Sequence, residues 1–388
     1  MTTTQPGTPG WLRTRNDRLA LALLLEHGPL TRNRLGELSG LSKPTAALMV
    51  SRLEEAGLIH VVGEASGGRG PNAAVYAVRN DRLRAVAIDI RETVMSATVV
   101  DATRTEHPIV EIPVLPHSRT PEGDVRQAID TAVTAAGVER GSVQLVAIGV
   151  QAAVSDSGDT LAFSETLPGW PEHGARRAIE AALELDVTID NDVNLAAVAE
   201  RAVGAAAGSE SVALLWMGSG LGVALDLDGR LHRGATGSAG EIGSLSVPRA
   251  AIDLAPDARD LTELIGGPAV TRILRRHGAR GKRLSELLAR LPDDAGALDE
   301  LAPRIALSVI PLVAILDPQL VVLGGPTGLA GGAALAERVA AQVARLSRWR
   351  TPVVATAAGP APVLTGAREL LVAELHRRLD SAVTGLPG

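Results

Sequence analysis

The amino-acid sequence predicts an α/β protein with a small, mainly helical head and a larger body of two lobes. Two observations carry this prediction. Three short helix patterns and a pair of strands occupy residues 11–80, and from residue 81 strands alternate with helices in two successive α/β units. A length of 388 residues suits two or three domains. We place the head at 11–80, the first lobe at 81–195 and the second lobe at 196–365.

The composition is that of an ordinary globular protein, 46% hydrophobic and 21% charged. The chain has no cysteine, which excludes disulfides and cysteine-ligated metal sites, and its eight histidines show no metal-ligand spacing. No apolar run reaches the ~18 residues that a membrane span needs, and the first ten residues do not resemble a signal peptide. We therefore expect a cytoplasmic protein with no cofactor, no metal and no membrane partner.

The net charge of −6 is distributed unevenly along the chain. Residues 1–80 contain nine Lys/Arg and six Asp/Glu, a net charge of +3, whereas residues 81–388 contain 29 and 38, a net charge of −9. A basic module joined to an acidic body is typical of a nucleic-acid-binding head on an unrelated domain.

The head has clear helix boundaries. A first helix in NDRLALALLLEHG ends at Gly28-Pro29, Thr31 can cap a second helix that stops at Gly40, and Ser42 can cap a third. Two apolar runs, LIHVV and AAVYAV, follow and are separated by a loop rich in turn residues. Three helices and a hairpin in this order predict a winged helix-turn-helix.

In a winged helix-turn-helix the N-terminal residues of the third helix enter the major groove of double-stranded DNA. Arg69, between glycines at the wing tip, has the reach for a phosphate or the minor groove. The alternative is a helical interaction module whose basic residues are ordinary solvated surface. On the first interpretation, the candidate DNA-binding residues are Thr31, Arg32, Ser42, Lys43, Thr45, Arg52 and Arg69.

The body begins with three strand patterns, LRAVAIDI, TVMSATVVD and HPIVEIPV, joined by short turns. Helix and strand patterns then alternate to the end of the chain, with a hairpin in ALLWMGSGLGVALDLDG. An antiparallel meander followed by β-α-β units, given twice, is typical of actin-like folds with a cleft between two lobes.

Two motifs in the body carry polar residues. Asn191 and Asp192 lie where a strand hands over to a helix, so Asp192 can accept a proton from a substrate hydroxyl, or the pair can simply cap the helix. The glycines at 218, 220 and 222 allow close approach of a phosphate or a tight hairpin, and Glu241 can bind a sugar hydroxyl. Each motif is weak when taken alone.

Together and in this order, the motifs resemble the ROK family of sugar kinases and sugar-responsive repressors. The resemblance spans nearly the whole chain. It implies an actin-like body that forms a dimer or tetramer through its second lobe, a C-terminal helix (366–388) that completes the first lobe, and a sugar in the cleft. It further implies that members with a winged head are repressors and members without one are usually kinases. The motifs are GGRGP in the wing, LPGW (167–170), NDVN (191–194), GSGLG (218–222), RGATGSAGEIGSLSV (233–247) and DPQLVVLGG (317–325).

The chain departs from the kinases of the family at the phosphate turn. Asp89 and Thr93 match, but Arg91-Glu92 fill a turn that the kinases build from glycines. Both side chains would take up space needed by a nucleotide, and Glu92 would repel its phosphates. We therefore expect no kinase activity and regard Asp192 as a vestigial general base. The vestigial phosphate site comprises Asp89, Thr93, Gly218, Gly220 and Gly222.

The zinc and sugar motifs also differ from the family pattern. The family's cysteine cluster is missing, Ser244 stands at its histidine position, and Thr166 replaces an asparagine before LPGW. A family glutamate aligns with Thr262, with Glu263 displaced by one position. The effector-binding residues implied by the resemblance are Thr166, Asn191, Asp192, Glu241 and Ser244.

Three hypotheses follow. The first is a transcriptional regulator, a repressor, that binds a pseudo-palindromic operator as a dimer and responds to a sugar or related metabolite in the cleft. The second is a sugar kinase with a DNA-binding head. The third is a regulator whose body has lost ligand binding and only dimerises.

Overall fold

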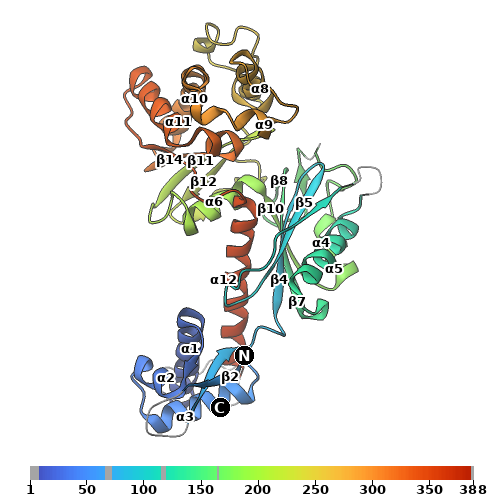
Figure 1. Ribbon diagram of the computed structural model, residues 1–388, viewed down its shortest axis with the longest axis vertical. Coiled ribbons are helices and arrows are strands. Elements are labelled where there is room, and N and C mark those ends of the chain that lie inside the picture. The colour runs from blue at the N-terminus through green and yellow to red at the C-terminus, as the bar shows by residue number, and fades with distance from the viewer. Residues whose placement is uncertain (1–7, 66–71, 115–118, 164–165, 386–388) are drawn as a thin grey trace.

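The computed structural model describes residues 8–65, 72–114, 119–163 and 166–385. The molecule is elongated, with the head at one end and the two lobes of the body stacked beyond it (Figure 1). A long helix, α12 (Pro362–Thr384), runs from the region between the lobes to the head. None of the helices in these described residues combines the length and the apolar character needed to cross a membrane.

The head has the winged helix-turn-helix arrangement that the sequence predicts. Its sheet also contains a two-residue strand, β1, which the sequence did not reveal and which pairs antiparallel with β3. The elements are α1 (Pro9–His27), β1 (Leu30–Thr31), α2 (Arg32–Ser39), α3 (Lys43–Glu55), β2 (Ile59–Ala65) and β3 (Ala73–Val78).

Local sequence explains where α2 and α3 begin and why they pack closely together. The side chain of Thr31 accepts the backbone N–H of Arg34, and the side chain of Ser42 accepts that of Thr45, so each helix begins where its cap residue predicts. Gly36 of α2 faces Ala46 of α3, where an added Cβ would lie 3.3 Å from the Ala46 Cβ. The two helices therefore pack closely, and α3 takes a fixed direction.

The first lobe is built on a five-stranded sheet in the order β10-β7-β4-β5-β6. The strands β10, β7 and β4 are parallel, and β5 and β6 extend the sheet as an antiparallel meander. One face packs against α4 and α5, and the other face packs against α12. The strands and helices are β4 (Arg84–Ile90), β5 (Val94–Val100), β6 (Val110–Pro113), α4 (Pro121–Ala136), β7 (Val143–Val150), α5 (Ala175–Leu183) and β10 (Asp186–Asn191).

The second lobe repeats the plan with a sheet in the order β13-β12-β11-β14-β15. Helices α7 to α11 bury one face of this sheet, and α6 covers the other. A small hairpin, β8 (Ala153–Val154) with β9 (Leu161–Ala162), belongs to the first lobe. The remaining elements are α6 (Asp192–Val203), β11 (Ser211–Met217), β12 (Leu221–Leu227), β13 (Arg230–Leu231), α7 (Leu261–Ile265), α8 (Gly267–Arg276), α9 (Leu284–Leu288), α10 (Ala295–Leu316), β14 (Leu320–Gly324), α11 (Gly325–Leu346) and β15 (Val353–Ala355).

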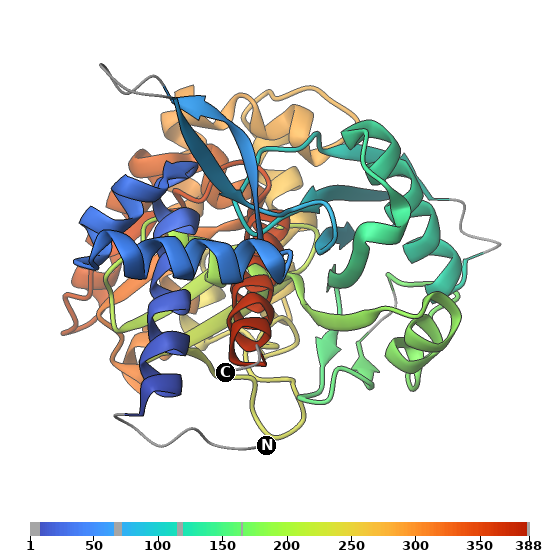
Figure 2. The same ribbon diagram turned by 90° about the horizontal axis from the view of Figure 1, so that it is seen from below.

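The helix α12 packs on the first lobe, and it begins at Pro362 rather than at residue 366. It crosses α6 at Gly366, where a Cβ would overlap the carbonyl oxygen of Leu195. Viewed from the head end, α12 points toward the viewer beside the helices of the head (Figure 2). Nε of Arg18 in α1 lies 2.7 Å from Oδ1 of Asp380, so the far end of α12 holds the head.

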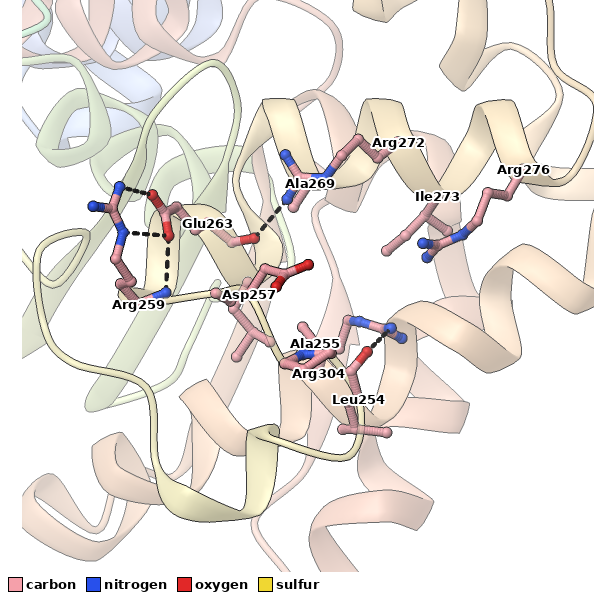
Figure 3. A pocket seen from close by; sticks show the side chains of 13 residues that line it. Leu254, Ala255, Asp257, Arg259, Glu263, Ala269, Arg272, Ile273, Arg276 and Arg304 are labelled. Atoms are coloured by element: carbon pink, nitrogen blue, oxygen red, sulfur yellow. Dashed lines mark hydrogen bonds and ion pairs between the residues drawn. The ribbon is translucent and has the colours of Figure 1, made fainter.

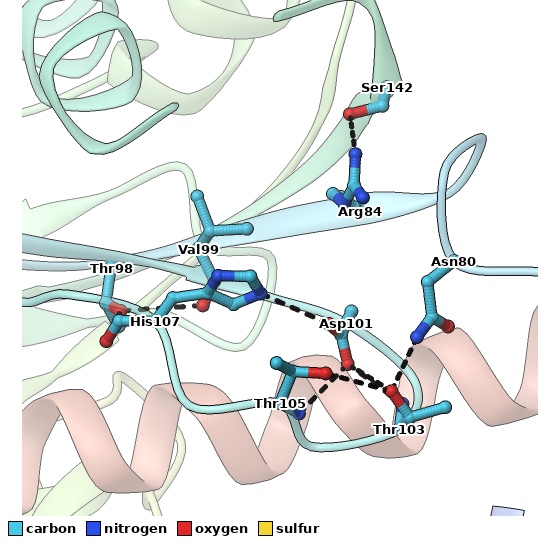
Figure 4. A network of polar contacts seen from close by, with 9 residues as sticks. All are labelled: Asn80, Arg84, Thr98, Val99, Asp101, Thr103, Thr105, His107 and Ser142. Atoms are coloured by element: carbon cyan, nitrogen blue, oxygen red, sulfur yellow. Dashed lines mark hydrogen bonds and ion pairs between the residues drawn. The ribbon is translucent and has the colours of Figure 1, made fainter. Parts of the chain in front are cut away.

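A polar network secures the segment that joins the wing to the body (Figure 4). Asn80 donates to the hydroxyl of Thr103 at 2.5 Å. The carboxylate of Asp101 accepts the backbone N–H groups of Thr103 and Thr105 and lies 3.1 Å from Nε2 of His107. Burial favours the neutral acid, but these hydrogen bonds outweigh it and lower the pKa of Asp101 below its ordinary value.

Candidate functional site

The outward face of α3 is the candidate DNA interface. Ser42 and Lys43 are exposed at its first turn, and Thr45 is half-buried with its hydroxyl 2.8 Å from that of Ser42. The N-terminal turn of α3 is therefore accessible, as docking in the major groove requires. Arg32 is exposed at the start of α2, where Thr31 acts as the cap.

Arg52 does not have the free side chain that we expected. Its guanidinium binds the carboxylate of Asp17 in α1, with Nε 3.0 Å from Oδ2 and a second contact from Nη2. Asp17 is only 3% exposed, so this ion pair ties the end of α3 to α1 inside the head. Arg52 is a structural residue of the head. The other candidate arginine, Arg69, lies outside the described residues.

Leu48 is a surface feature that sequence reasoning missed. It lies in the middle of α3 and is 63% exposed, whereas Ala46, Met49, Val50 and Leu53 form the buried face. Assignment of the apolar residues of α3 to its two faces would have found it, because Leu48 lies outside the buried stripe.

The cleft between the lobes contains two neighbouring cavities of about 630 and 470 Å³. Gln151, Asp192, Trp216 and Ser219 line both of them. Asp89, Gln151 and Asn191 lie at the carboxyl ends of the parallel strands β4, β7 and β10, where ligands of open α/β sheets bind. Across from them lies the Gly218–Gly220 turn between β11 and β12 of the second lobe.

Asp192 is the central acid of the cleft. It is 7% exposed, and its Oδ1 accepts the backbone N–H of Val193. Burial, followed by the negative charges of Asp89 and Glu241, raises the pKa of Asp192 to about 7. Burial also raises the pKa of Asp89 to about 6, against the opposing charge of Arg91. Two acids that titrate near neutral pH therefore lie in one cleft.

The phosphate turn is only partly as expected. Arg91 lines the larger cavity, with Nε 3.2 Å from Oδ2 of Asp89 and Nη2 3.2 Å from the hydroxyl of Ser96. Its backbone N–H donates to the carbonyl of Val94 and closes the turn. Glu92 and Thr93 are exposed and line neither cavity, because the closed turn directs them away. Of the two side chains that we expected in the nucleotide space, Arg91 lines the larger cavity of the cleft, and Glu92 lines neither cavity.

Asn191 is mainly a helix cap. Its Oδ1 accepts the N–H groups of Val193 and Asn194, and its Nδ2 donates to the carbonyl of Ala152 at 2.9 Å. The amide still lines the smaller cavity. Thr166 lines the same cavity and donates from its hydroxyl to the carbonyl of Gln151.

Glu241 and Ser244 line the smaller cavity together with Gly220 and Gly222, whereas Gly218 lines the larger cavity. Gly240 has a φ of 90°, and a Cβ there would overlap the carbonyl oxygen of Val223, so only glycine brings Glu241 to this place. Thr262 also lines this cavity, whereas Glu263 binds Arg259 and faces elsewhere.

Sequence reasoning also missed a buried support for the Gly-rich segment 233–247. The guanidinium of Arg233 binds the carboxylate of Asp190, which is buried and also accepts Nδ2 of Asn194. Burial opposes the charge of Arg233, but the bond to Asp190 outweighs it and raises the pKa of Arg233. In the described part of the chain, no group of three His, Cys, Asp or Glu side chains is placed to hold a metal ion.

Comparison with known proteins supports the assignment of both the head and the body. The ROK family profile matches residues 85–372, which is most of the sequence. The protein belongs to the ROK family. A winged helix-turn-helix DNA-binding profile matches residues 13–60 in front of the ROK body.

Regulators and kinases both occur among the relatives of this ROK protein. It is 25% identical over 242 residues to the xylose repressor of Bacillus spizizenii, covering 60% of each chain. It spans 54% to 60% of the length of the first curated relatives. A ROK transcriptional regulator homologous to the E. coli MLC protein shares the fold over 96% of this chain and 99% of its own, with a TM-score of 0.68 and 17% identity. The Thermus thermophilus ROK hexokinase aligns with 75% of this chain and 100% of its own, with a TM-score of 0.60 and 26% identity.

Proposed function

We propose that this protein is a DNA-binding transcriptional repressor that acts as a dimer on a pseudo-palindromic operator. The observation that carries the proposal is the exposed N-terminal half of α3, with Ser42, Lys43 and Leu48 on its outward face. This face lies in a winged helix-turn-helix ahead of a ROK body. A two-fold dimer presents two such faces to half-sites separated by whole turns of DNA.

The same proposal assigns a sugar or related metabolite to the interlobe cleft as the effector. Asp192 and Glu241 line the smaller cavity and can hydrogen-bond hydroxyl groups. The first residues of α12 line the larger cavity, and its far end contacts the head. A ligand that prefers one lobe arrangement therefore shifts the position of the head through α12.

Kinase activity is the second candidate, and the raised pKa of Asp192 favours it, because a general base works best when its pKa lies near the working pH. We rank it below the regulator because Arg91 neutralises Asp89 and closes the turn where the kinases of the family have glycines. Calorimetric titration with ATP and magnesium separates the two. Absence of nucleotide binding removes the kinase, and phosphorylation of a sugar establishes it.

Selection of genomic DNA fragments by the full-length protein tests the regulator. We expect recovery of a palindromic sequence by the wild type and a strong loss of recovery with Lys43→Ala. Lys282→Ala is the matched control, because it removes a lysine between α8 and α9, two helices that lie at the end of the molecule opposite the head (Figure 1). Failure to enrich any sequence at both low and moderate salt, with and without sugars, contradicts the proposal.

A thermal-shift screen of sugars tests the effector. A ligand that binds only the folded protein raises the melting temperature. A stabilising sugar must lose its effect in Asp192→Asn while the variant still binds operator DNA. If no sugar stabilises the protein although it binds an operator, the hypothesis of a body that only dimerises is favoured.

A further inference from the structure

A third cavity, of about 530 Å³, lies in the helical part of the second lobe. Its walls are the segment 254–259, α7, α8 and α10 (Figure 3). Among the described residues it shares no lining residue with the two cavities of the cleft. It is therefore a separate site, and its size falls within the range of small-molecule pockets, about 300–1,000 Å³.

Four arginines are among the residues that line this cavity. Arg259 is neutralised by Glu263, which accepts two of its side-chain N–H groups. Three further guanidinium groups line the cavity, those of Arg272, Arg276 and Arg304. They come from two helices, α8 and α10, so the cavity collects positive charge from separate elements (Figure 3).

The acidic groups nearby do not balance these three charges. Arg276 and Arg304 share one carboxylate, that of Glu300, which also contacts Nε2 of His277 at 2.9 Å. Arg272 donates to a backbone carbonyl, that of Glu263. Glu300 does not itself line the cavity; apart from Glu263, which binds Arg259, Asp257 is the acid of the lining. Three guanidinium groups thus face two carboxylates, which leaves one positive charge without a counterpart.

Arg304 shows the consequence of this imbalance most clearly. It is 7% exposed and donates to the carbonyls of Glu300 and Leu254. Burial lowers the pKa of Arg304, Glu300 opposes this, and the positive charge of Arg276 lowers it further. An anion in the cavity would relieve both the burial and the repulsion.

The chain around the cavity is basic as well. Residues 272–290 contain seven Lys/Arg and one Glu, a net charge of +6, in a body whose net charge is −9. This segment lies at the end of the molecule opposite the head, so it does not extend the DNA-binding surface of the same protomer (Figure 1). Its positive field attracts anions toward the cavity.

We propose that this cavity binds the phosphoryl group of a small phosphorylated metabolite. A guanidinium group matches phosphate oxygens through two parallel hydrogen bonds, and several guanidinium groups around one dianion give strong, oriented binding. The concave shape selects a small molecule rather than a nucleic-acid backbone. Arg272, Arg276 and Arg304 bind the phosphoryl oxygens, and the rest of the cavity holds the organic part. This site is independent of the sugar cleft and of the proposed repressor function.

Calorimetry and thermal shift with the full-length protein test this site, using inorganic phosphate, sulfate, glucose 6-phosphate and glucose as probes. We expect glucose 6-phosphate to bind and stabilise the protein and inorganic phosphate to bind more weakly. Any effect of glucose should be the same in the wild type and in a variant of this cavity. In Arg272→Ala/Arg276→Ala, binding of the phosphate ester should weaken at least about tenfold per lost contact. Neither side chain is buried, so the variant should fold, and an unchanged circular dichroism spectrum checks this.

The matched control is Arg275→Ala/Arg280→Ala, which removes two arginines of the same segment that do not line the cavity. It should bind glucose 6-phosphate like the wild type. Equal weakening in both double variants would mean that only the general field of the segment attracts anions, which overturns the proposal. Binding of phosphate and sulfate without preference for the ester, or displacement of the ester by short duplex DNA, overturns it as well.

Discussion

Arg52 and Lys43 are basic residues of the same helix, yet they have different roles. Lys43 is exposed at the first turn of α3, whereas Arg52 is bound to the buried carboxylate of Asp17. Charge and position in the sequence do not distinguish them. The partner of Arg52 lies 35 residues away, and only the packing of α1 against α3 brings the two together.

Arg52→Ala should therefore destabilise the head rather than remove a DNA contact. It leaves the carboxylate of Asp17 buried without its partner, which costs about 3 kcal/mol of unfolding free energy. Thermal unfolding followed by circular dichroism measures the loss. Arg52→Ala/Asp17→Leu should recover part of the stability, because it removes the unpaired charge. A stable Arg52→Ala protein with weakened DNA binding would restore Arg52 to the interface.

Asp192 makes the stability of the protein depend on pH. Its pKa is about 7 in the folded protein and about 3.9 in an unfolded chain. Because the folded pKa is raised, the stabilising effect of proton uptake is fully present below about pH 4 and is lost as the pH rises through about 7. Asp192→Asn removes this dependence, so it should raise the melting temperature more at pH 8 than at pH 5.

The control for this pH dependence is Asp228→Asn, at an exposed turn between β12 and β13. Its melting temperature should follow that of the wild type over the whole pH range. Parallel profiles for Asp192→Asn and the wild type would show that Asp192 does not titrate near neutral pH.

Among the elements, α3 has an outward face that combines one exposed cation with an exposed leucine. Lys43 is its exposed cation at the N-terminal turn, Arg52 is engaged with Asp17, and Leu48 places an isobutyl group at the centre of the outward face. In the major groove, apolar side chains read the methyl group of thymine. The outward face of α3 therefore predicts thymine at the centre of each half-site.

Replacement of that thymine by uracil tests this prediction, because it removes one methyl group and leaves all hydrogen-bonding groups in place. The loss should be about 1 kcal/mol per methyl contact for the wild type. Leu48→Ala should bind more weakly and be insensitive to the exchange, which a double-mutant cycle measures. Ser51→Ala, at an exposed position one turn further along α3, is the control. Equal sensitivity of the wild type and Leu48→Ala would exclude the contact.

The elements themselves follow from the sequence wherever the signal is local. Neighbouring residues determine the caps at Thr31 and Ser42 and the apolar stripe of α3. They also determine the alternating strands and helices of the body. The strand β1 was missed because two residues carry no periodicity and Leu30 joins the sheet only by pairing with Tyr76. The exposure of Glu92 was missed because a turn sets side-chain direction through its own hydrogen bond, here from Arg91 to Val94.

In the cleft, too, residues in local motifs were predicted and contacts made by tertiary packing were not. Asp192 and Glu241 were predicted because their motifs are local, and both line the smaller cavity. The bond between Arg233 and Asp190, 43 residues apart, and the shared carboxylate of Glu300 depend on tertiary packing, and no local pattern reveals them.

At the scale of the whole molecule, the basic head and acidic body predict binding that depends steeply on salt. Each phosphate contact contributes about −0.9 to the slope of log K against log salt. Arg32 and Lys43 from two heads would give a slope of about −4 or steeper. Fluorescence anisotropy with a labelled operator at several salt concentrations measures it.

The change in slope for Lys43→Ala also reports the assembly. If Lys43 contacts a phosphate, the slope should become shallower by about two for a dimer and by about one for a monomer. Lys282→Ala should leave the slope unchanged. A wild-type slope near zero would contradict phosphate contacts altogether.

The position of α12 has a consequence for how the chain folds during synthesis. The sheet of the first lobe is complete once residue 191 has been made, but the helix that covers one of its faces begins only at Pro362. At ~5–20 residues per second, a ribosome needs roughly ten to thirty seconds to make the intervening chain. During that time an apolar face of the nascent first lobe is exposed to solvent. The nascent chain should therefore depend on chaperones until α12 has been synthesised.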